Sequence, residues 1–159
     1  MLFICTGNIC RSPTVEAVAR VEFARAGLDI EVASAGTENY HVGQQADRRA
    51  IAVAEAAGYP MSAHRARQVC AADFDRFDLL LAMDRANLRA LNRSHGTAGA
   101  DCVALFLEYA GIDTVELPDP YYGERRDFEL ALDLARRGVA VIIERLQASS
   151  AGLPTSAQH

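Results

Sequence analysis

Residues 1–13 of the chain read MLFICTGNICRSP, and this stretch predicts both the fold and the site. Residues 1–4 are apolar and can form a strand, while Ser12-Pro13 is typical of a helix start, with serine as the N-cap and proline in the first turn. A short loop containing Gly7 joins the two. Backbone N–H groups converge on an anion where a strand, a tight loop and a helix N-terminus meet, so we expect a phosphate-binding loop here.

Two side chains of this loop predict chemistry beyond binding. Cys5 ends the strand, so its sulfur is expected beneath the anion site, where the loop N–H groups and the helix dipole stabilise a thiolate. Arg11 ends the loop, and its guanidinium can hold two phosphate oxygens as charge redistributes during a reaction. A buried cysteine and a solvated arginine are the plain alternative, which the surrounding loop residues disfavour.

Composition limits the class of protein. The chain has 159 residues, of which 50% are hydrophobic and 23% charged, as in a single soluble domain with a core. Its net charge of −5 argues against a nucleic-acid partner, and no apolar run could span a membrane. The four cysteines lack zinc-site spacing, so we expect neither a metal nor another cofactor. No secretory signal is visible, which favours a cytoplasmic location and leaves secretion without a signal peptide open.

Apolar periodicity predicts alternating strands and helices. Strands are expected at 1–4, 30–34, 79–82 and 102–107, and helices at 13–26, 47–57, 84–92 and 128–146, although 106–109 can also form a helix. This order predicts an α/β fold: one domain over 1–147, with a four-stranded parallel sheet covered by helices on both faces, doubly wound and flavodoxin-like, and the phosphate loop after the first strand. Residues 93–101 are expected to be a loop and 148–159 a disordered tail.

A second stretch, LPDPYYG (117–123), predicts an acid. Prolines on both sides fix the backbone around Asp119 and limit where its carboxyl group points. Expulsion of an alkoxide or phenoxide from a phosphate monoester needs a proton, which a carboxylic acid can supply and later recover from water. Asp-Pro is also a common turn, but its combination with the phosphate loop favours catalysis. Tyr121 and Tyr122 can line a slot for a phenyl ring.

Residues 5–13 (CTGNICRSP) and 119–123 (DPYYG) together resemble the signatures of the low-molecular-weight protein tyrosine phosphatases, and the resemblance extends over about 1–146. It implies metal-independent hydrolysis of phosphotyrosine through a phosphocysteine on Cys5. Asp119 would be the general acid and base, and Arg11 would bind phosphate. The other residues that the resemblance assigns to phosphate or substrate are Thr6, Gly7, Asn8, Ile9, Cys10, Ser12, Tyr40, Tyr121 and Tyr122.

The resemblance also implies supporting roles. His64 and Ser34, with Ser12, would hydrogen-bond Asn8 and hold it in a left-handed conformation. Cys10 would form a reversible disulfide with Cys5 under oxidation. The implied partner is a phosphotyrosine-bearing protein, with tyrosine kinases among the candidates, and the expected state is a monomer or weak dimer.

Three alternatives remain beside this interpretation. Thioredoxin-coupled arsenate reductases share the fold and a Cys-Thr-Gly-Asn loop, but they need two further cysteines close together, whereas Cys70 and Cys102 are far apart in sequence. Protein-arginine phosphatases place threonine where this chain has Ile9, and an apolar residue suits an aromatic ester better. A non-catalytic phosphotyrosine-binding module would need neither the nucleophile nor the acid.

Overall fold

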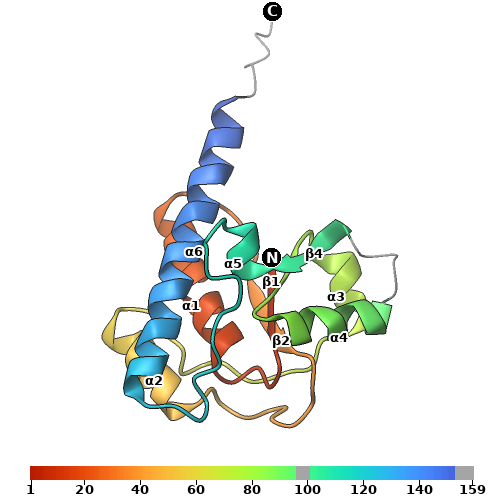
Figure 1. Cartoon of the computed structure of the whole chain (residues 1–159). Helices are drawn as coiled ribbons and strands as arrows, with labels where there is room; N and C mark the ends of the chain where they lie inside the picture. Colours follow the sequence, from red (N-terminus) through yellow and green to blue (C-terminus); the bar gives the residue numbers. More distant parts are fainter. Residues whose placement is uncertain (96–100, 153–159) are drawn as a thin grey trace, which may run out of the picture.

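The computed structural model describes residues 1–95 and 101–152 and has a parallel sheet at its centre (Figure 1). Its strand order is β2-β1-β3-β4. The strands are β1 (Leu2–Cys5), β2 (Ala33–Gly36), β3 (Leu80–Ala82) and β4 (Val103–Leu105). Strand β1 pairs in parallel with both β2 and β3, so the loop that follows it lies between two neighbouring strand ends.

Helices cover both faces of this sheet. They are α1 (Arg11–Arg25), α2 (Arg48–Ala56), α3 (Ala71–Arg76), α4 (Arg85–His95), α5 (Phe106–Tyr109) and α6 (Arg125–Ala151). Phe3 packs with residues of α1, α2 and α6 in one apolar cluster, while Leu2 and Ile4 pack with Leu91 of α4 in another. Alternate residues of a strand point to opposite faces, so β1 is buried on both sides. The predicted α/β fold is confirmed.

Several boundaries differ from the sequence prediction. Helix α1 begins at Arg11 with Cys10 as its N-cap, so Ser12 is not the cap; its hydroxyl instead faces Cys5 and Asn8 inside the protein. Strand β2 is Ala33–Gly36 rather than 30–34. At its last residue, Gly36, an added Cβ would lie 2.6 Å from the carbonyl oxygen of Thr6, which is too close for any side chain. A glycine therefore lets β2 approach the phosphate loop.

Three segments outside the sheet also differ. Helix α3 was not expected; Asp73 in its first turn accepts a hydrogen bond from the backbone N–H of Cys70. Helix α4 continues past the expected end at 92 to His95, and residues 96–100 of the predicted loop lie outside the described residues. Segment 106–109 forms helix α5.

Helix α6 continues into the segment predicted to be a disordered tail. It ends at Ala151, and its last part extends beyond the body of the protein (Figure 1). The hydroxyls of Ser149 and Ser150 donate to the carbonyl oxygens of Arg145 and Leu146, one turn back in the same helix. The predicted tail is therefore wrong at its start, and residues 153–159 lie outside the described residues. No helix in the described part of the chain is long and apolar enough to cross a membrane.

Candidate active site

The loop between β1 and α1 places a buried sulfur beneath backbone N–H groups. Cys5 is 3% exposed, and its Sγ accepts a hydrogen bond from the backbone N–H of Asn8 at 3.3 Å. Ser12 Oγ lies 3.0 Å from the same sulfur. Asn8 has φ of 56°, a left-handed conformation that turns the loop and that asparagine adopts more readily than most residues. The sulfur therefore has two potential hydrogen-bond donors that can stabilise negative charge on it.

Asn8 is the centre of the hydrogen bonds that hold the loop. Its Nδ2 donates to Ser12 Oγ and to Ser34 Oγ, both at 2.9 Å, and its Oδ1 accepts from the backbone N–H of Arg67 at 3.0 Å. Its carbonyl oxygen accepts from His64 Nε2 at 2.8 Å. The fully buried amide is thus satisfied on every side. Ser12, Ser34 and His64 make the contacts that were expected of them.

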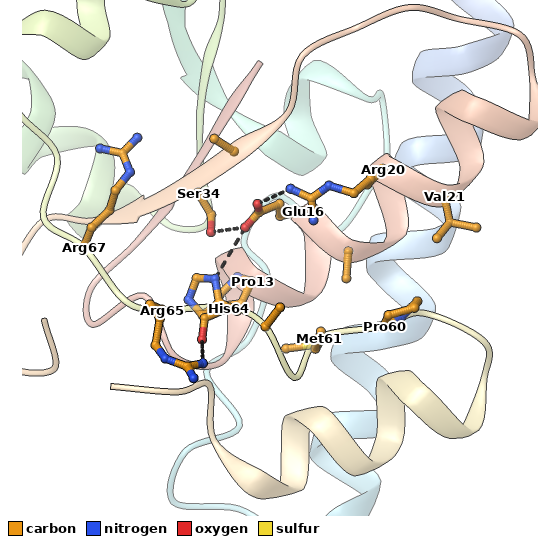
Figure 2. A pocket seen from close by; sticks show the side chains of 13 residues that line it. Pro13, Glu16, Arg20, Val21, Ser34, Pro60, Met61, His64, Arg65 and Arg67 are labelled. Carbon is orange, nitrogen blue, oxygen red and sulfur yellow. Dashed lines mark hydrogen bonds and ion pairs between the residues drawn. The ribbon is translucent and has the colours of Figure 1, made fainter. Parts of the chain in front are cut away.

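Glu16 supports these residues from behind the loop, and the sequence analysis did not identify it. Its carboxylate accepts from Ser34 Oγ at 2.5 Å and from Arg20 at 2.6 Å, and it lies 3.6 Å from His64 Nδ1 (Figure 2). Burial alone would raise the pKa of Glu16, but hydrogen bonds from His64, Ser34 and Arg20 outweigh burial and lower it. These residues line a pocket of about 520 Å³, whose lining contains no cysteine.

Arg11 is buried and held by two acceptors. Its Nη1 donates to Asp84 Oδ2 at 2.6 Å and to the carbonyl oxygen of Leu117 at 3.2 Å, and its Nη2 lies 3.7 Å from Asp119 Oδ2. Burial alone would lower the pKa of Arg11, but Cys5, Asp84 and Asp119 raise it above its ordinary value. The guanidinium is therefore charged and fixed beside both the sulfur and the acid.

Asp119 stands at the mouth of the cleft on a loop that is held at its start and turns after the acid. The backbone N–H of Leu117 donates to the carbonyl oxygen of Met83 at 2.9 Å, and the backbone N–H of Gly123 closes a turn by donating to the carbonyl oxygen of Pro120 at 2.8 Å. Within this loop Asp119 Oδ1 accepts from the backbone N–H of Tyr121 at 3.1 Å. The Asp119 side chain is 52% exposed, so its carboxyl group can meet both a substrate and water.

The cleft above the sulfur has a volume of about 320 Å³ and an aromatic rim. Tyr40 comes from the loop after β2, and the rings of Tyr121 and Tyr122 meet edge to face with centroids 4.9 Å apart. His41 also lines the cleft; its ring lies close to Gly7, where a Cβ would approach it to 2.9 Å. The complete lining is Cys5, Thr6, Gly7, Ile9, Cys10, Arg11, Tyr40, His41, Asp119, Tyr121 and Tyr122.

The structure thus brings the three predicted catalytic residues into one cleft. Asn8, Ser12, Ser34 and His64 are absent from the lining of the cleft and support its floor. Besides Glu16, the sequence analysis missed Asn87, whose Nδ2 donates to Thr6 Oγ1 at 3.1 Å. In the described part of the chain, no three His, Cys, Asp or Glu side chains gather as a metal site would require.

Cys10 is the second buried cysteine of the loop. Burial above all, and then the charges of Asp47, Cys5 and Asp119, raise the pKa of its thiol well above the ordinary range. Cys10 therefore remains a thiol at neutral pH. It is the N-cap of α1, but its side chain makes no capping hydrogen bond. As a protonated thiol it is less nucleophilic than a thiolate.

Comparisons with known proteins agree with this geometry. A family model described as low molecular weight phosphotyrosine protein phosphatase matches residues 1–152, which include both loops. A low molecular weight protein-tyrosine-phosphatase of Streptomyces coelicolor is 48% identical over 139 residues, 83% of this chain and 84% of the relative. A low molecular weight phosphotyrosine protein phosphatase of Schizosaccharomyces pombe is 43% identical over 128 residues, 77% of this chain and 81% of the relative.

Solved structures show the same fold. The crystal structure of a protein tyrosine phosphatase from Entamoeba histolytica, with Hepes in its active site, superposes with a TM-score of 0.88 at 35% sequence identity. The superposition covers 94% of this chain and 97% of that chain. The similarity therefore extends over nearly the whole of both proteins.

Proposed function

This chain belongs to the low molecular weight phosphotyrosine protein phosphatase family, and we propose that it hydrolyses phosphotyrosine through a phosphocysteine on Cys5. One observation carries this mechanism: the buried Arg11 guanidinium lies between the loop that holds Cys5 and the carboxylate of Asp119. The thiol, the cation and the acid are the three groups that transfer of a phosphoryl group to sulfur needs.

In the first step Cys5 Sγ attacks phosphorus in line with the leaving oxygen. The S–P bond forms, the P–O bond to the tyrosine ring breaks, and Asp119 donates its proton to the departing phenol oxygen. Arg11 and the loop N–H groups hold the three remaining phosphate oxygens. The anion site is fixed before the reaction because Asn8 and Arg11 are already held by hydrogen bonds.

In the second step water cleaves the phosphocysteine. Asp119, now ionised, takes a proton from the attacking water, the S–P bond breaks, and inorganic phosphate leaves. Ser12 Oγ, at 3.0 Å from the sulfur, stabilises the departing thiolate. The carboxylate of Asp119 is exposed enough to reach solvent in this step.

The aromatic rim supports an aryl phosphate as substrate. Tyr40 and Tyr121 can contact the faces or edges of a phenyl ring that enters the cleft. Ile9 presents an apolar side chain in the same lining, which suits an aryl ester better than a charged phosphoguanidinium. The lining contains neither Cys70 nor Cys102, the cysteines that an arsenate reductase would need beside its nucleophile.

The proposal places the protein in the cytoplasm, acting on phosphotyrosine-bearing proteins such as tyrosine kinases as a monomer or weak dimer. The substrate can be captured with the Asp119→Ala variant, which should retain the phosphate loop, bind the phosphoprotein and hydrolyse it only slowly. Phosphotyrosine proteins enriched by this variant and displaced by an aryl phosphate would support the proposal. Equal enrichment by an Arg11→Ala variant would contradict it, because that variant lacks the phosphate-binding cation.

Redox control by Cys10 is part of the same proposal. Peroxide would oxidise the Cys5 thiolate to a sulfenic acid, and the Cys10 thiol would then displace water from it to form a disulfide. A small thiol would reduce the disulfide and restore Cys5. Peroxide inactivation should therefore be reversible in the wild type and largely irreversible in Cys10→Ser. Equal recovery of both proteins would remove Cys10 from this role.

Steady-state hydrolysis of 4-nitrophenyl phosphate at mildly acidic pH, with chelator present, tests the function. We expect turnover that a chelator leaves unchanged and that falls by about 100-fold or more in Asp119→Ala. A wild type that binds phosphate without turning over the ester would contradict catalysis and favour a phosphotyrosine-binding module. Reduction of arsenate would instead favour the reductase alternative.

A further inference from the structure

Arg49, on the first turn of α2, contacts the acid loop from outside. Its Nη2 donates to the carbonyl oxygen of Tyr121 at 2.9 Å. Its guanidinium carbon also lies 5.7 Å from the centroid of the Tyr121 ring and 4.6 Å from that of Phe128 in α6. Phe128 is only 3% exposed and belongs to the core, so it gives Arg49 a fixed surface to pack against.

Asp47 fixes the other side of the same guanidinium. Arg49 Nε and Nη2 donate to its two carboxylate oxygens at 3.0 and 2.9 Å, and the Arg49 backbone N–H donates to Asp47 Oδ1 at 2.8 Å. The backbone N–H of Asp47 in turn donates to the carbonyl oxygen of Ile9 at 2.8 Å. One arginine and one aspartate therefore connect the phosphate loop to the acid loop.

Tyr121 completes the path to the acid. Its carbonyl oxygen accepts from Arg49, and its backbone N–H donates to Asp119 Oδ1 at 3.1 Å. From this arrangement we infer that Arg49 is a positioning residue for the general acid: it holds the Tyr121 backbone so that the Asp119 carboxyl group stays over the Arg11 guanidinium. The inference rests on the proposed role of Asp119.

Arginine has the shape that this position needs. Its planar group donates to Asp47 and to the Tyr121 carbonyl at once and still presents a flat face to an aromatic ring. Lysine would keep the charge but cannot make the forked contact or the stacked one in the same geometry. Arg49→Lys therefore separates positioning of the loop from the mere presence of a cation near the cleft.

Esters with different leaving groups distinguish a misplaced general acid from other defects. The acid matters most for esters whose leaving group is a strong base, and least for esters whose leaving group departs readily. We would measure kcat/KM for 4-nitrophenyl phosphate, phenyl phosphate and an alkyl phosphate in Arg49→Ala, Arg49→Lys and Asp119→Ala. Both Arg49 variants should lose about 10-fold or more in kcat/KM on the poorer leaving groups and clearly less on 4-nitrophenyl phosphate, whose leaving group needs the acid least.

Arg48→Ala is the matched control, because Arg48 is the neighbouring exposed arginine on the same helix and its loss changes the charge equally. Its kcat/KM should equal that of the wild type for all three esters. Inhibition by inorganic phosphate should also be unchanged in the Arg49 variants, since their phosphate loop is intact. If Arg49→Ala does not fold, as judged by circular dichroism, Arg49→Lys carries the test alone.

Three results would overturn the inference. The first is a loss in Arg49→Ala that is equal for all leaving groups, and the second is full recovery in Arg49→Lys, which would leave only a charge effect. The third is a parallel loss of phosphate inhibition, which would place the effect in the phosphate loop. If the loss of kcat/KM in Asp119→Ala is the same for every leaving group, the proposed function fails. If the loss in Asp119→Ala depends on the leaving group but the loss in the Arg49 variants does not, the positioning inference alone fails.

Discussion

Arg11 and Asp84 form an ion pair of 2.6 Å in which the arginine side chain is 4% exposed and the aspartate side chain 16%. Arg11 follows β1 and Asp84 follows β3, and these strands are neighbours in parallel register. Because parallel strands end at the same edge of a sheet, the topology itself brings the two side chains together. Asp84 also accepts from the backbone N–H of Asn87 at 2.8 Å, so the same carboxylate caps α4.

Replacement of Asp84 by alanine should damage both stability and phosphate binding. The buried guanidinium would lose its carboxylate, and breaking a buried pair from one side costs about 3–5 kcal/mol of unfolding free energy. Arg11 would also be free to turn from the anion site, which should raise KM for an aryl phosphate. Urea denaturation and steady-state kinetics measure the two effects.

Glu116→Ala, which removes an exposed partner of Arg85, is the control and should cost about 1 kcal/mol or less of unfolding free energy. Equal losses in the two variants would contradict this account of Asp84.

Glu16 should make stability depend on acid pH. Its pKa is lowered in the folded protein, so its contribution is complete above the pKa of the unfolded chain and is lost as pH falls through the folded value. Glu16→Gln should therefore be less stable than the wild type at neutral pH, and the difference should shrink below about pH 4. Urea denaturation across this range measures it. Glu144→Gln, at an exposed site on α6, should show no such convergence. A difference for Glu16→Gln that is constant with pH would rule out ionisation as its cause.

Cys10 should resist alkylation at neutral pH. The thiolate is the reactive form, and burial with nearby negative charge raises the pKa of this thiol far above neutrality. Iodoacetamide followed by peptide mapping should therefore label exposed Cys70 well before Cys10. Inorganic phosphate should slow the labelling of Cys5 without affecting Cys70. Labelling of Cys10 as fast as that of Cys70 would contradict the assigned charge state.

The sequence was informative where chemistry is local. Cys5, Arg11 and Asp119 lie in short stretches whose residue types leave few uses, and the alternation of strands and helices predicts the parallel sheet. The left-handed conformation of Asn8 was expected from the resemblance to the family, and the structure confirms it with φ of 56°. Such features can be predicted from the sequence because each short stretch carries its own pattern of residue types.

Residues that act across the fold were missed. Glu16 contacts Ser34 and His64, and Asn87 contacts Thr6, through pairs that are 18 to 81 residues apart in the sequence. Asp84 was expected only as the first residue of the helix at 84–92, since nothing in the neighbouring sequence indicates that its carboxylate accepts a hydrogen bond from Arg11. Ser12-Pro13 misled although its contacts are local: the helix begins at Arg11, and the Ser12 hydroxyl contacts Cys5 and Asn8 in the same loop rather than capping the helix.

The central claim is that phosphate is transferred to Cys5 before it reaches water. Rapid acid quenching of the enzyme during hydrolysis of 4-nitrophenyl phosphate, followed by mass spectrometry of its peptides, tests this most directly. The account predicts one phosphoryl group on the peptide that contains Cys5, present in the wild type and absent in Cys5→Ser, which should not turn over. A peptide that stays unmodified under turnover, together with hydrolysis by Cys5→Ser, would contradict the account.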